Sequence, residues 1–281
     1  MSQNKESKSD RLAGNKAFGA IRILLVLILL GIVIYEGIMV YKDQKEYAIA
    51  VNEYEELKDN YITEKEDIIE DVVVTDENGE VVGTYPKLDI NYDALEEINS
   101  DFIGWLYFPA VPKINYPVVK EQSIDQYLYR TFDGKYNKAG CIFMDVLSNE
   151  GFDGYSDMVF GHNMKNNSMF GSLKSIYKAD GEDIIKDNPF VYIYTKEHVL
   201  KYRIFAYYRT TQGSYSYTEV TNENEYDDYL KYISRNTMYE MPSGLGFDDY
   251  PSLLTLSTCS GPSGSGQRFV LHTVKVQTFD K

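Results

Sequence analysis

Apolar residues follow three patterns along the chain, and each predicts a different kind of structure. Residues 23–35 form an unbroken run of apolar residues and glycine. Extended to residues 21–40, the run reaches about 20 residues, enough for a helix that spans a bilayer. Over residues 47–61, apolar and aromatic residues recur every three or four positions, which predicts an amphipathic helix. From residue 86 onward the apolar runs are short and bounded by turn residues, as in a protein of many short strands.

The third region predicts a mainly β fold with peripheral helices, arranged as a closed or nearly closed β-barrel. Residues 72–84 contain Asn78-Gly79 between two valine-rich runs, which predicts a hairpin, with a loose linker arm as the alternative. Pro117 suggests that its strand lies at a sheet edge, and Ser123 can cap a helix that carries Tyr127 and Leu128. Further helices are expected at residues 91–99, 169–177 and 223–235, and strands at 102–106, 114–119, 139–144, 157–161, 190–195, 199–211, 252–258 and 267–278.

The residues before the apolar run predict its orientation in a membrane. Five lysines and arginines precede it against two acidic residues, so the N-terminus is expected in the cytoplasm. A cleaved secretory signal is the alternative, but the small residues at 48–50 lie too far beyond the run to serve as its cleavage site. We therefore expect a cytoplasmic tail (1–16), a transmembrane signal anchor (17–41), a helical stalk or linker (42–85) and a strand-rich domain (86–281).

Overall charge narrows the classes of partner. The chain carries 43 acidic and 28 basic side chains, a net charge of −15, and it has no basic stripe interleaved with aromatic residues. Nucleic acid is therefore not expected as a partner. The 26 tyrosines are interpreted as packing residues.

Candidate chemistry centres on Cys259. A short apolar strand ends at this cysteine, a loop of Gly, Pro and Ser follows, and Arg268 stands near the start of the next strand. If the two strands pair, a thiolate lies beside a permanent cation that can stabilise it or a developing oxyanion. His162 also stands where an apolar strand ends and is the best candidate for a base. His198 is expected in a solvated turn, and His272 as a packed or surface residue.

The second cysteine, Cys141, lies within an apolar run and is expected to be buried and inert. A Cys141–Cys259 disulfide is the alternative, because exported cysteines are commonly oxidised, but the different surroundings of the two residues argue against it. Three histidines without acidic or cysteine partners at ligand spacing make a zinc site improbable, and no cofactor is expected.

These residues resemble the motifs of class B sortases, in the order that the family shows them. The matching segments are Thr255-Leu256-Ser257-Thr258-Cys259, Arg268-Phe269-Val270, Gly161-His162-Asn163-Met164, Asp101-Phe102-Ile103-Gly104-Trp105-Leu106, Ile114-Asn115-Tyr116-Pro117-Val118-Val119, Gly140-Cys141-Ile142-Phe143-Met144-Asp145 and Met169-Phe170. The resemblance covers roughly residues 86–281. It implies an eight-stranded sortase barrel behind an N-terminal anchor, with catalytic His162, Cys259 and Arg268.

The resemblance also implies the reaction and its partners. A class B sortase of Gram-positive bacteria is a cysteine transpeptidase of the cell membrane with an extracellular catalytic domain. It cleaves the C-terminal sorting signal of surface proteins after Thr and transfers the protein to an amine of a peptidoglycan precursor or a pilin. The substrate-binding residues implied here are Ser257, Leu128, Thr211, Tyr215 and Ser216. Two positions depart from the family pattern: Cys141 replaces a serine, and Ile124 replaces an asparagine that faces the substrate in some relatives.

Three alternatives differ from this interpretation in testable ways. An L,D-transpeptidase acting on peptidoglycan would have Gly directly before the cysteine and Arg close behind it, whereas here Thr258 precedes Cys259 and Arg268 comes nine residues later. A papain-like peptidase would have its cysteine before its histidine. A non-enzymatic, membrane-anchored surface-binding domain would keep its function after Cys259→Ala.

Overall fold

The computed structural model describes residues 3–62, 70–178, 181–262 and 264–281, with side chains from residue 18 onward. It divides into two compact units, Met1–Ile49 and Ala50–Lys281. Helix α1 covers Gln3–Tyr61, and its apolar side chains between Phe18 and Tyr41 are exposed. Among the described residues, this is the one helix long and apolar enough to cross a membrane.

The last turns of α1 belong to the second unit, as the amphipathic pattern predicts. Tyr54 is 2% exposed and Leu57 is 7% exposed. The Tyr54 hydroxyl donates a hydrogen bond of 2.8 Å to the carbonyl of Gly140, and its ring meets the ring of Tyr116 edge-on at 5.4 Å. Residues predicted as a stalk therefore pack on the same unit as the barrel.

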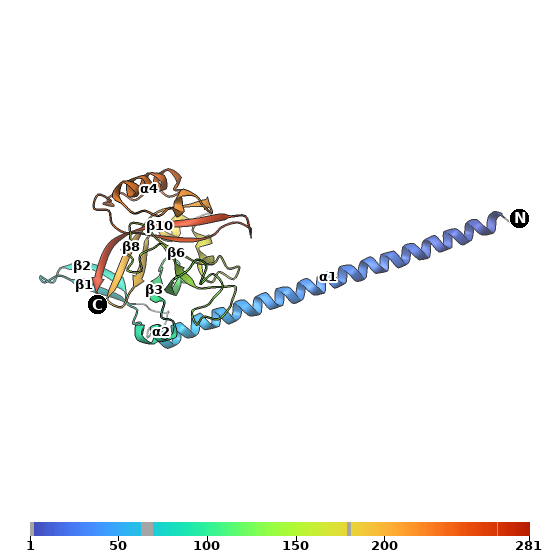
Figure 1. Cartoon of the computed structure of the whole chain (residues 1–281), viewed down its shortest axis with the longest axis horizontal. Coiled ribbons are helices and arrows are strands. Elements are labelled where there is room, and N and C mark those ends of the chain that lie inside the picture. The colour runs from blue at the N-terminus through green and yellow to red at the C-terminus, as the bar shows by residue number, and fades with distance from the viewer. Residues whose placement is uncertain (1–2, 63–69, 179–180, 263) are drawn as a thin grey trace. The chain divides into compact units, whose positions relative to one another are not determined.

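The second unit is built around a closed barrel of eight strands, in the order β10-β8-β7-β3-β4-β5-β6-β9 (Figure 1). The predicted barrel is confirmed. Most of its strands carry continuous apolar runs because both of their faces are covered. The strands are β3 (Phe102–Tyr107), β4 (Asn115–Lys120), β5 (Ile142–Met144), β6 (Asp157–Phe160), β7 (Phe190–Tyr194), β8 (His198–Thr211), β9 (Leu253–Cys259) and β10 (Gln267–Asp280).

Pairing is antiparallel except at two places, β4 with β5 and β6 with β9. A separate antiparallel hairpin joins β1 (Asp71–Thr75) and β2 (Val81–Pro86). Gly79 has a φ of 81° in its turn, as the Asn-Gly signal predicts. The hairpin is attached to the barrel, since Gln277 of β10 donates to the carbonyl of Val82 at 3.0 Å.

Helices cover the outside of the barrel. Helix α4 (Glu223–Asn236) lies against the barrel near β10 (Figure 1). It begins after Asn222, whose side chain accepts from the N–H of Glu225, and it packs Tyr226, Tyr229 and Ile233 against residues of β8, β9 and β10. The helix predicted at residues 223–235 is confirmed. The remaining helices are α2 (Tyr92–Ile98), η1 (Phe170–Ser175), α3 (Gly181–Ile185) and η2 (Tyr215–Tyr217).

Three local predictions are corrected. Strand β4 is not at an edge but lies between β3 and β5; its pairing with β5 begins only at Val118, so Pro117 lies just outside it. The helix predicted after Ser123 is a series of turns, because Asp125 has a φ of 62°, a left-handed conformation that ends a helix. The helix predicted at residues 169–177 is the shorter 3₁₀-helix η1, which begins after Met169 at a φ of 52°.

Candidate active site

The parallel pairing of β6 with β9 brings His162 and Cys259 to the same end of the barrel. Phe160 pairs with Ser257, and His162 and Cys259 each lie two residues beyond that pair. Two bonds extend the alignment past the strands: the N–H of Gly161 donates to the carbonyl of Ser257 at 3.2 Å, and the Thr258 hydroxyl donates to the carbonyl of Gly161 at 2.7 Å. Because parallel strands end at a shared edge, two residues far apart in sequence become neighbours.

Gly161 lies in close contact with the barrel wall just before the histidine loop, residues 162–169. A Cβ atom at this position would lie 2.5 Å from the Ile142 side chain and 2.7 Å from the ring of Phe170. Any other residue would therefore push against the packed wall of the barrel just before His162.

The antiparallel pairing of β9 with β10 places Arg268 directly opposite Cys259. One guanidinium nitrogen of Arg268, Nη1, donates to the carbonyl of Gln267 at 3.2 Å. The other, Nη2, donates to the side-chain oxygen of Gln212 at 3.1 Å. The predicted pairing of thiol and guanidinium across two strands is thus present in the structure.

A backbone carbonyl fixes the hydrogen of His162. Its Nε2 lies 2.7 Å from the carbonyl oxygen of Leu128. A carbonyl oxygen only accepts, so Nε2 carries the hydrogen and Nδ1 is left as the ring atom that can exchange a proton. The ring of Tyr129 stacks on the imidazole with centroids 5.8 Å apart. Leu128 and Tyr129 together hold the plane of the histidine ring.

Burial is the main reason that the pKa of His162 lies below its ordinary value. The positive charge of Arg268 lowers this pKa further, while the bond to Leu128 acts in the opposite direction. A lower pKa makes the imidazolium rarer at neutral pH but a stronger acid when it forms.

Asn163 is a functional candidate to which the sequence motif gave no role. Its side-chain nitrogen donates a 2.7 Å hydrogen bond to the carbonyl of Cys259. Its backbone forms an isolated bridge with Met169, and the N–H of Met169 is bound by the Tyr116 hydroxyl at 3.0 Å. The histidine loop is therefore tied both to the cysteine and to β4.

One cavity of about 560 Å³ contains all three predicted catalytic residues. Glu121 also lines this cavity, and burial raises the pKa of its carboxyl group to about 7. A thiol, an imidazole and a guanidinium thus face a single space large enough for a peptide segment. Other residues that line it are Ile124, Leu128, Gln212, Tyr217 and Ser257.

The model of the sortase domain family matches residues 106–276 of the chain, more than half of its length. The chain belongs to the sortase family. It is similar to Sortase B of Listeria monocytogenes, with 27% identity over 240 residues that cover 84% of this chain and 88% of the relative. It is also similar to Sortase B of Staphylococcus aureus, with 25% identity over 186 residues that cover 66% and 74%.

Solved structures of sortase B proteins are also similar to this chain. Sortase B from Bacillus anthracis in complex with AAEK1 superimposes with a TM-score of 0.64 at 25% identity, covering 83% of this chain and 99% of that one. Clostridium perfringens sortase B gives a TM-score of 0.59 at 26% identity, covering 66% and 100%. The chain is therefore a class B sortase, and sortases are cysteine transpeptidases.

Two of the five substrate-binding residues predicted for this sortase line the cavity, Leu128 and Ser257. Ser257 is fully buried, and its hydroxyl hydrogen-bonds to that of Tyr217 at 2.9 Å. Thr211 ends β8, and Tyr215 and Ser216 belong to η2. None of the three is among the lining residues, although their neighbours Gln212 and Tyr217 are. Tyr215 packs on the rings of Tyr229 and Tyr232, and Ser216 is buried against the hydroxyl of Tyr208 at 3.0 Å.

The other cysteine and histidines of the sortase lie outside this cavity. Cys141 is fully buried and unpaired with Cys259, and burial raises the pKa of its thiol to about 12. His272 is buried between the hydroxyls of Thr255 and Tyr208, and burial lowers its pKa to about 3. His198 is exposed and hydrogen-bonds to Asp280. In the described part of the chain, no three acidic, cysteine or histidine side chains gather in a way that could hold a metal ion.

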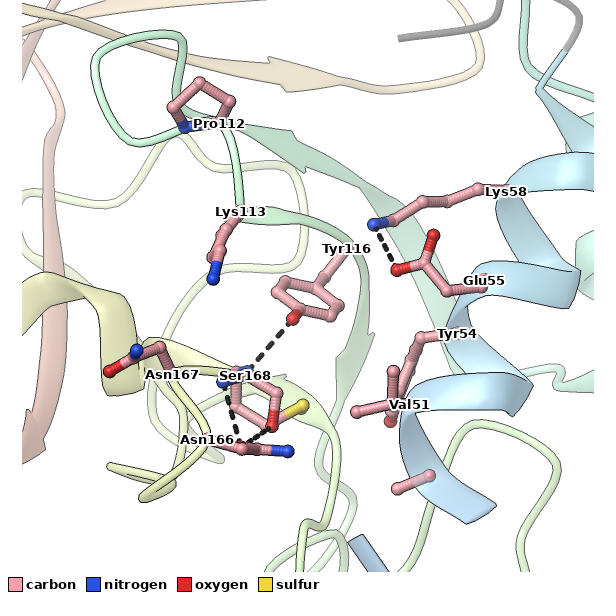
Figure 2. Close-up of a pocket in the computed structure, with 12 residues that line it drawn as sticks. Val51, Tyr54, Glu55, Lys58, Pro112, Lys113, Tyr116, Asn166, Asn167 and Ser168 are labelled. Atoms are coloured by element: carbon pink, nitrogen blue, oxygen red, sulfur yellow. Dashed lines mark hydrogen bonds and ion pairs between the residues drawn. The ribbon is translucent and has the colours of Figure 1, made fainter. Parts of the chain in front are cut away.

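A second, smaller cavity of about 310 Å³ is lined by the end of α1, by Tyr116 of β4 and by residues 166–169 (Figure 2). The end of α1 forms one wall through Tyr54 and Lys58, with Tyr116 between that wall and the loop at Asn166 and Ser168. Figure 2 shows the Tyr116 hydroxyl directed at this loop. The cavity contains none of the predicted catalytic residues and shares only the loop with the active site.

Proposed function

We propose that Cys259, His162 and Arg268 are the catalytic residues of this sortase, with Cys259 as the nucleophile. The observation that carries the proposal is their convergence on one cavity from three strand ends. Each also has a chemical property suited to its role: a thiol that can attack a carbonyl, a ring nitrogen that can exchange a proton, and a fixed cation with several donors.

In the first half-reaction, the Cys259 thiolate attacks the carbonyl carbon of a threonine in the bound peptide. The electron pair of the carbonyl moves onto oxygen, and N–H groups of Arg268 stabilise that oxyanion. Nδ1 of protonated His162 gives its proton to the departing amine as the C–N bond breaks. The products are a thioester on Cys259, a neutral imidazole and a released peptide with a free N-terminus.

In the second half-reaction, an acceptor amine attacks the thioester carbonyl, and neutral His162 takes the proton that the amine loses. The tetrahedral intermediate expels the Cys259 thiolate and leaves a new amide. Protons and charges are then as they were before the cycle began. Leu128 supports both steps, because its carbonyl keeps the hydrogen of the neutral ring on Nε2 and the lone pair on Nδ1.

We assign the substrate as a surface protein with a C-terminal sorting signal that is cut after Thr, and the acceptor as an amine of a peptidoglycan precursor or a pilin. The family acts on sorting-signal proteins and amine acceptors. Leu128 and Ser257 bind the peptide within the cavity, while Thr211, Tyr215 and Ser216 shape the loop beside it.

The apolar part of α1 anchors the enzyme in the cell membrane, with the N-terminus in the cytoplasm and the catalytic unit outside. Supporting this are the length and apolar character of the helix and the excess of basic residues before it. The catalytic unit then faces the same compartment as exported proteins that carry the sorting signal.

The proposal is tested with the full chain in detergent micelles. A library of threonine-containing peptides and a panel of amines are supplied together, and mass spectrometry identifies the cleavage position and the attached amine. We expect fragments that end in Thr and are joined to an acceptor, and no product from Cys259→Ala. Cleavage that persists in Cys259→Ala, or that falls elsewhere than after Thr, would contradict it.

A further inference from the structure

The turn after β8 is fixed to the active-site strands at Gln212. The N–H of Ser214 donates to the carbonyl of Thr211 at 3.1 Å, and Gly213 between them has a φ of 77° that favours glycine. The N–H of Gln212 itself donates to the carbonyl of Gly266 at 2.7 Å. The backbone of Gln212 is thus held between the β8 turn and the loop that joins β9 to β10.

With its backbone fixed, the Gln212 side chain reaches Arg268. Its amide oxygen accepts from Nη2 at 3.1 Å, while Nη1 of the same guanidinium donates to the carbonyl of Gln267 at 3.2 Å. Both residues line the cavity that contains Cys259. The guanidinium is therefore held by oxygen atoms from two neighbouring strand ends.

These bonds orient the guanidinium without occupying all of it. A guanidinium has five N–H donors in a planar fork, and the two bonds use two of them. Arginine is otherwise a long side chain with several rotatable bonds, and freezing it on a substrate costs entropy. An acceptor that fixes the plane in advance lowers that cost. Because the Gln212 amide is neutral, it leaves the charge of Arg268 intact.

We propose that Gln212 is the positioning residue of Arg268 and sets the plane in which its guanidinium meets the oxyanion. This inference rests on the role of Arg268 given under the proposed function. Gln212 acts through Arg268 alone, so its removal lowers the rate of acylation and changes peptide binding much less.

The test is a double-mutant cycle in the full chain in detergent micelles, using Gln212→Met, Arg268→Ala and the double variant. Methionine keeps the length of glutamine and removes its acceptor. Single-turnover acylation by a sorting peptide at increasing concentration separates the limiting rate from the half-saturating concentration. Gln277→Met is the matched control, because Gln277 bonds to Val82 of the β1–β2 hairpin, away from the cavity.

We expect Gln212→Met to lower the limiting acylation rate about tenfold, less than the loss of an oxyanion donor itself. The half-saturating concentration should change by less than about twofold. In the Arg268→Ala background the same substitution should have no further effect, since coupled residues are non-additive. Gln277→Met should acylate like the unmodified chain, and thermal melts should show every variant folded.

Two results would overturn the inference about Gln212 and leave the proposed role of Arg268 intact. One is an unchanged rate in Gln212→Met while Arg268→Ala is slow. The other is an equal loss in both backgrounds, which would make Gln212 a support of the turn independent of Arg268. Near-normal acylation by Arg268→Ala would instead remove the role of Arg268 itself, and the inference with it.

Discussion

The side-chain nitrogen of Asn163 donates a 2.7 Å hydrogen bond to the backbone carbonyl of Cys259. The residue that follows the candidate base therefore holds the backbone of the candidate nucleophile. Since Cys259 is the last residue of β9 and a Gly-rich loop follows it, this bond restrains the thiol where the strand pairing ends.

The first prediction concerns this bond. Asn163→Asp should slow acylation about tenfold or more, because a carboxylate replaces the donor and faces a carbonyl oxygen at hydrogen-bond distance. Asn163→Ala should be milder, losing one bond worth about 1 kcal/mol. Single-turnover acylation and thermal melts measure both. Equal rates in Asn163→Asp and the unmodified chain would show that the bond does not restrain the nucleophile.

The second prediction concerns the titration of His162. Burial and the charge of Arg268 both lower its pKa, so removing that charge in Arg268→Gln should raise the pKa toward its ordinary value. Raising the pKa extends the protonated form to higher pH. NMR of the imidazole resonances across pH 4–9 measures the shift.

His272 is the internal control for that titration, because burial lowers its pKa to about 3. It should remain neutral throughout and be unaffected by Arg268→Gln. A His162 titration that is identical in both proteins would mean that the guanidinium does not act on the imidazole.

The third prediction separates a base from a fixed cation. His162→Ala should stop both acylation and transfer, because it removes the ring nitrogen that exchanges the proton beside Cys259. Arg268→Lys keeps the charge but loses the planar fork, so it should fail almost as badly as Arg268→Ala, by about a hundred- to a thousand-fold in rate. Acylation and transfer are measured separately, with folding checked by circular dichroism. Arg268→Lys at the unmodified rate would show that charge alone suffices.

The fourth prediction uses the backbone of Gly140. A Cβ atom there would lie 2.5 Å from the Leu128 carbonyl oxygen that His162 binds, at a φ of +61°. Gly140→Ala should displace that carbonyl and lower activity at least tenfold, since a small misplacement of a catalytic group is costly.

Gly134→Ala is its matched control. Gly134 also has a positive φ, of +80°, but a Cβ there meets nothing within 4 Å. It should lose about 1 kcal/mol of stability from backbone strain and keep its activity. Activity and melting temperature are measured for both variants. If Gly134→Ala loses as much activity as Gly140→Ala, strain rather than the displaced carbonyl is responsible.

The fifth prediction concerns the thiols. In the native chain a thiol-directed reagent should modify Cys259, which lines the cavity, and spare Cys141, which is fully buried with a pKa raised to about 12. Peptide mapping by mass spectrometry before and after denaturation measures both. Equal labelling in the native state, or a disulfide in non-reducing maps, would contradict the assignment.

The features that could be predicted from the sequence are those that depend on short-range patterns or on motifs. Residues 223–235 show helical periodicity, and they form α4 nearly as expected. Cys259 and Arg268 are separated by one loop, so their pairing follows from two adjacent strands. His162 is singled out by its motif, whereas its approach to Cys259 depends on the long-range pairing of β6 with β9.

What the sequence missed depends on contacts between distant segments. Leu128 holds His162 through its backbone carbonyl, and a carbonyl leaves no mark on residue type. Gln212 is an ordinary polar turn residue until the fold brings it to Arg268. The turns after Ser123 were predicted as a helix because a left-handed Asp125 is allowed but is not encoded by any strong local signal.

The burial of Cys141 has a consequence for survival in an oxidising environment. A thiolate that is oxidised to sulfenic acid can be protected by a second thiol of its own chain, which must reach it to form a disulfide. The chain has two cysteines, and Cys141, directly before β5, is fully buried. A sulfenic acid at Cys259 therefore cannot be resolved by a disulfide with Cys141 in the folded chain, and rescue by a disulfide depends on small thiols or reductases supplied from outside.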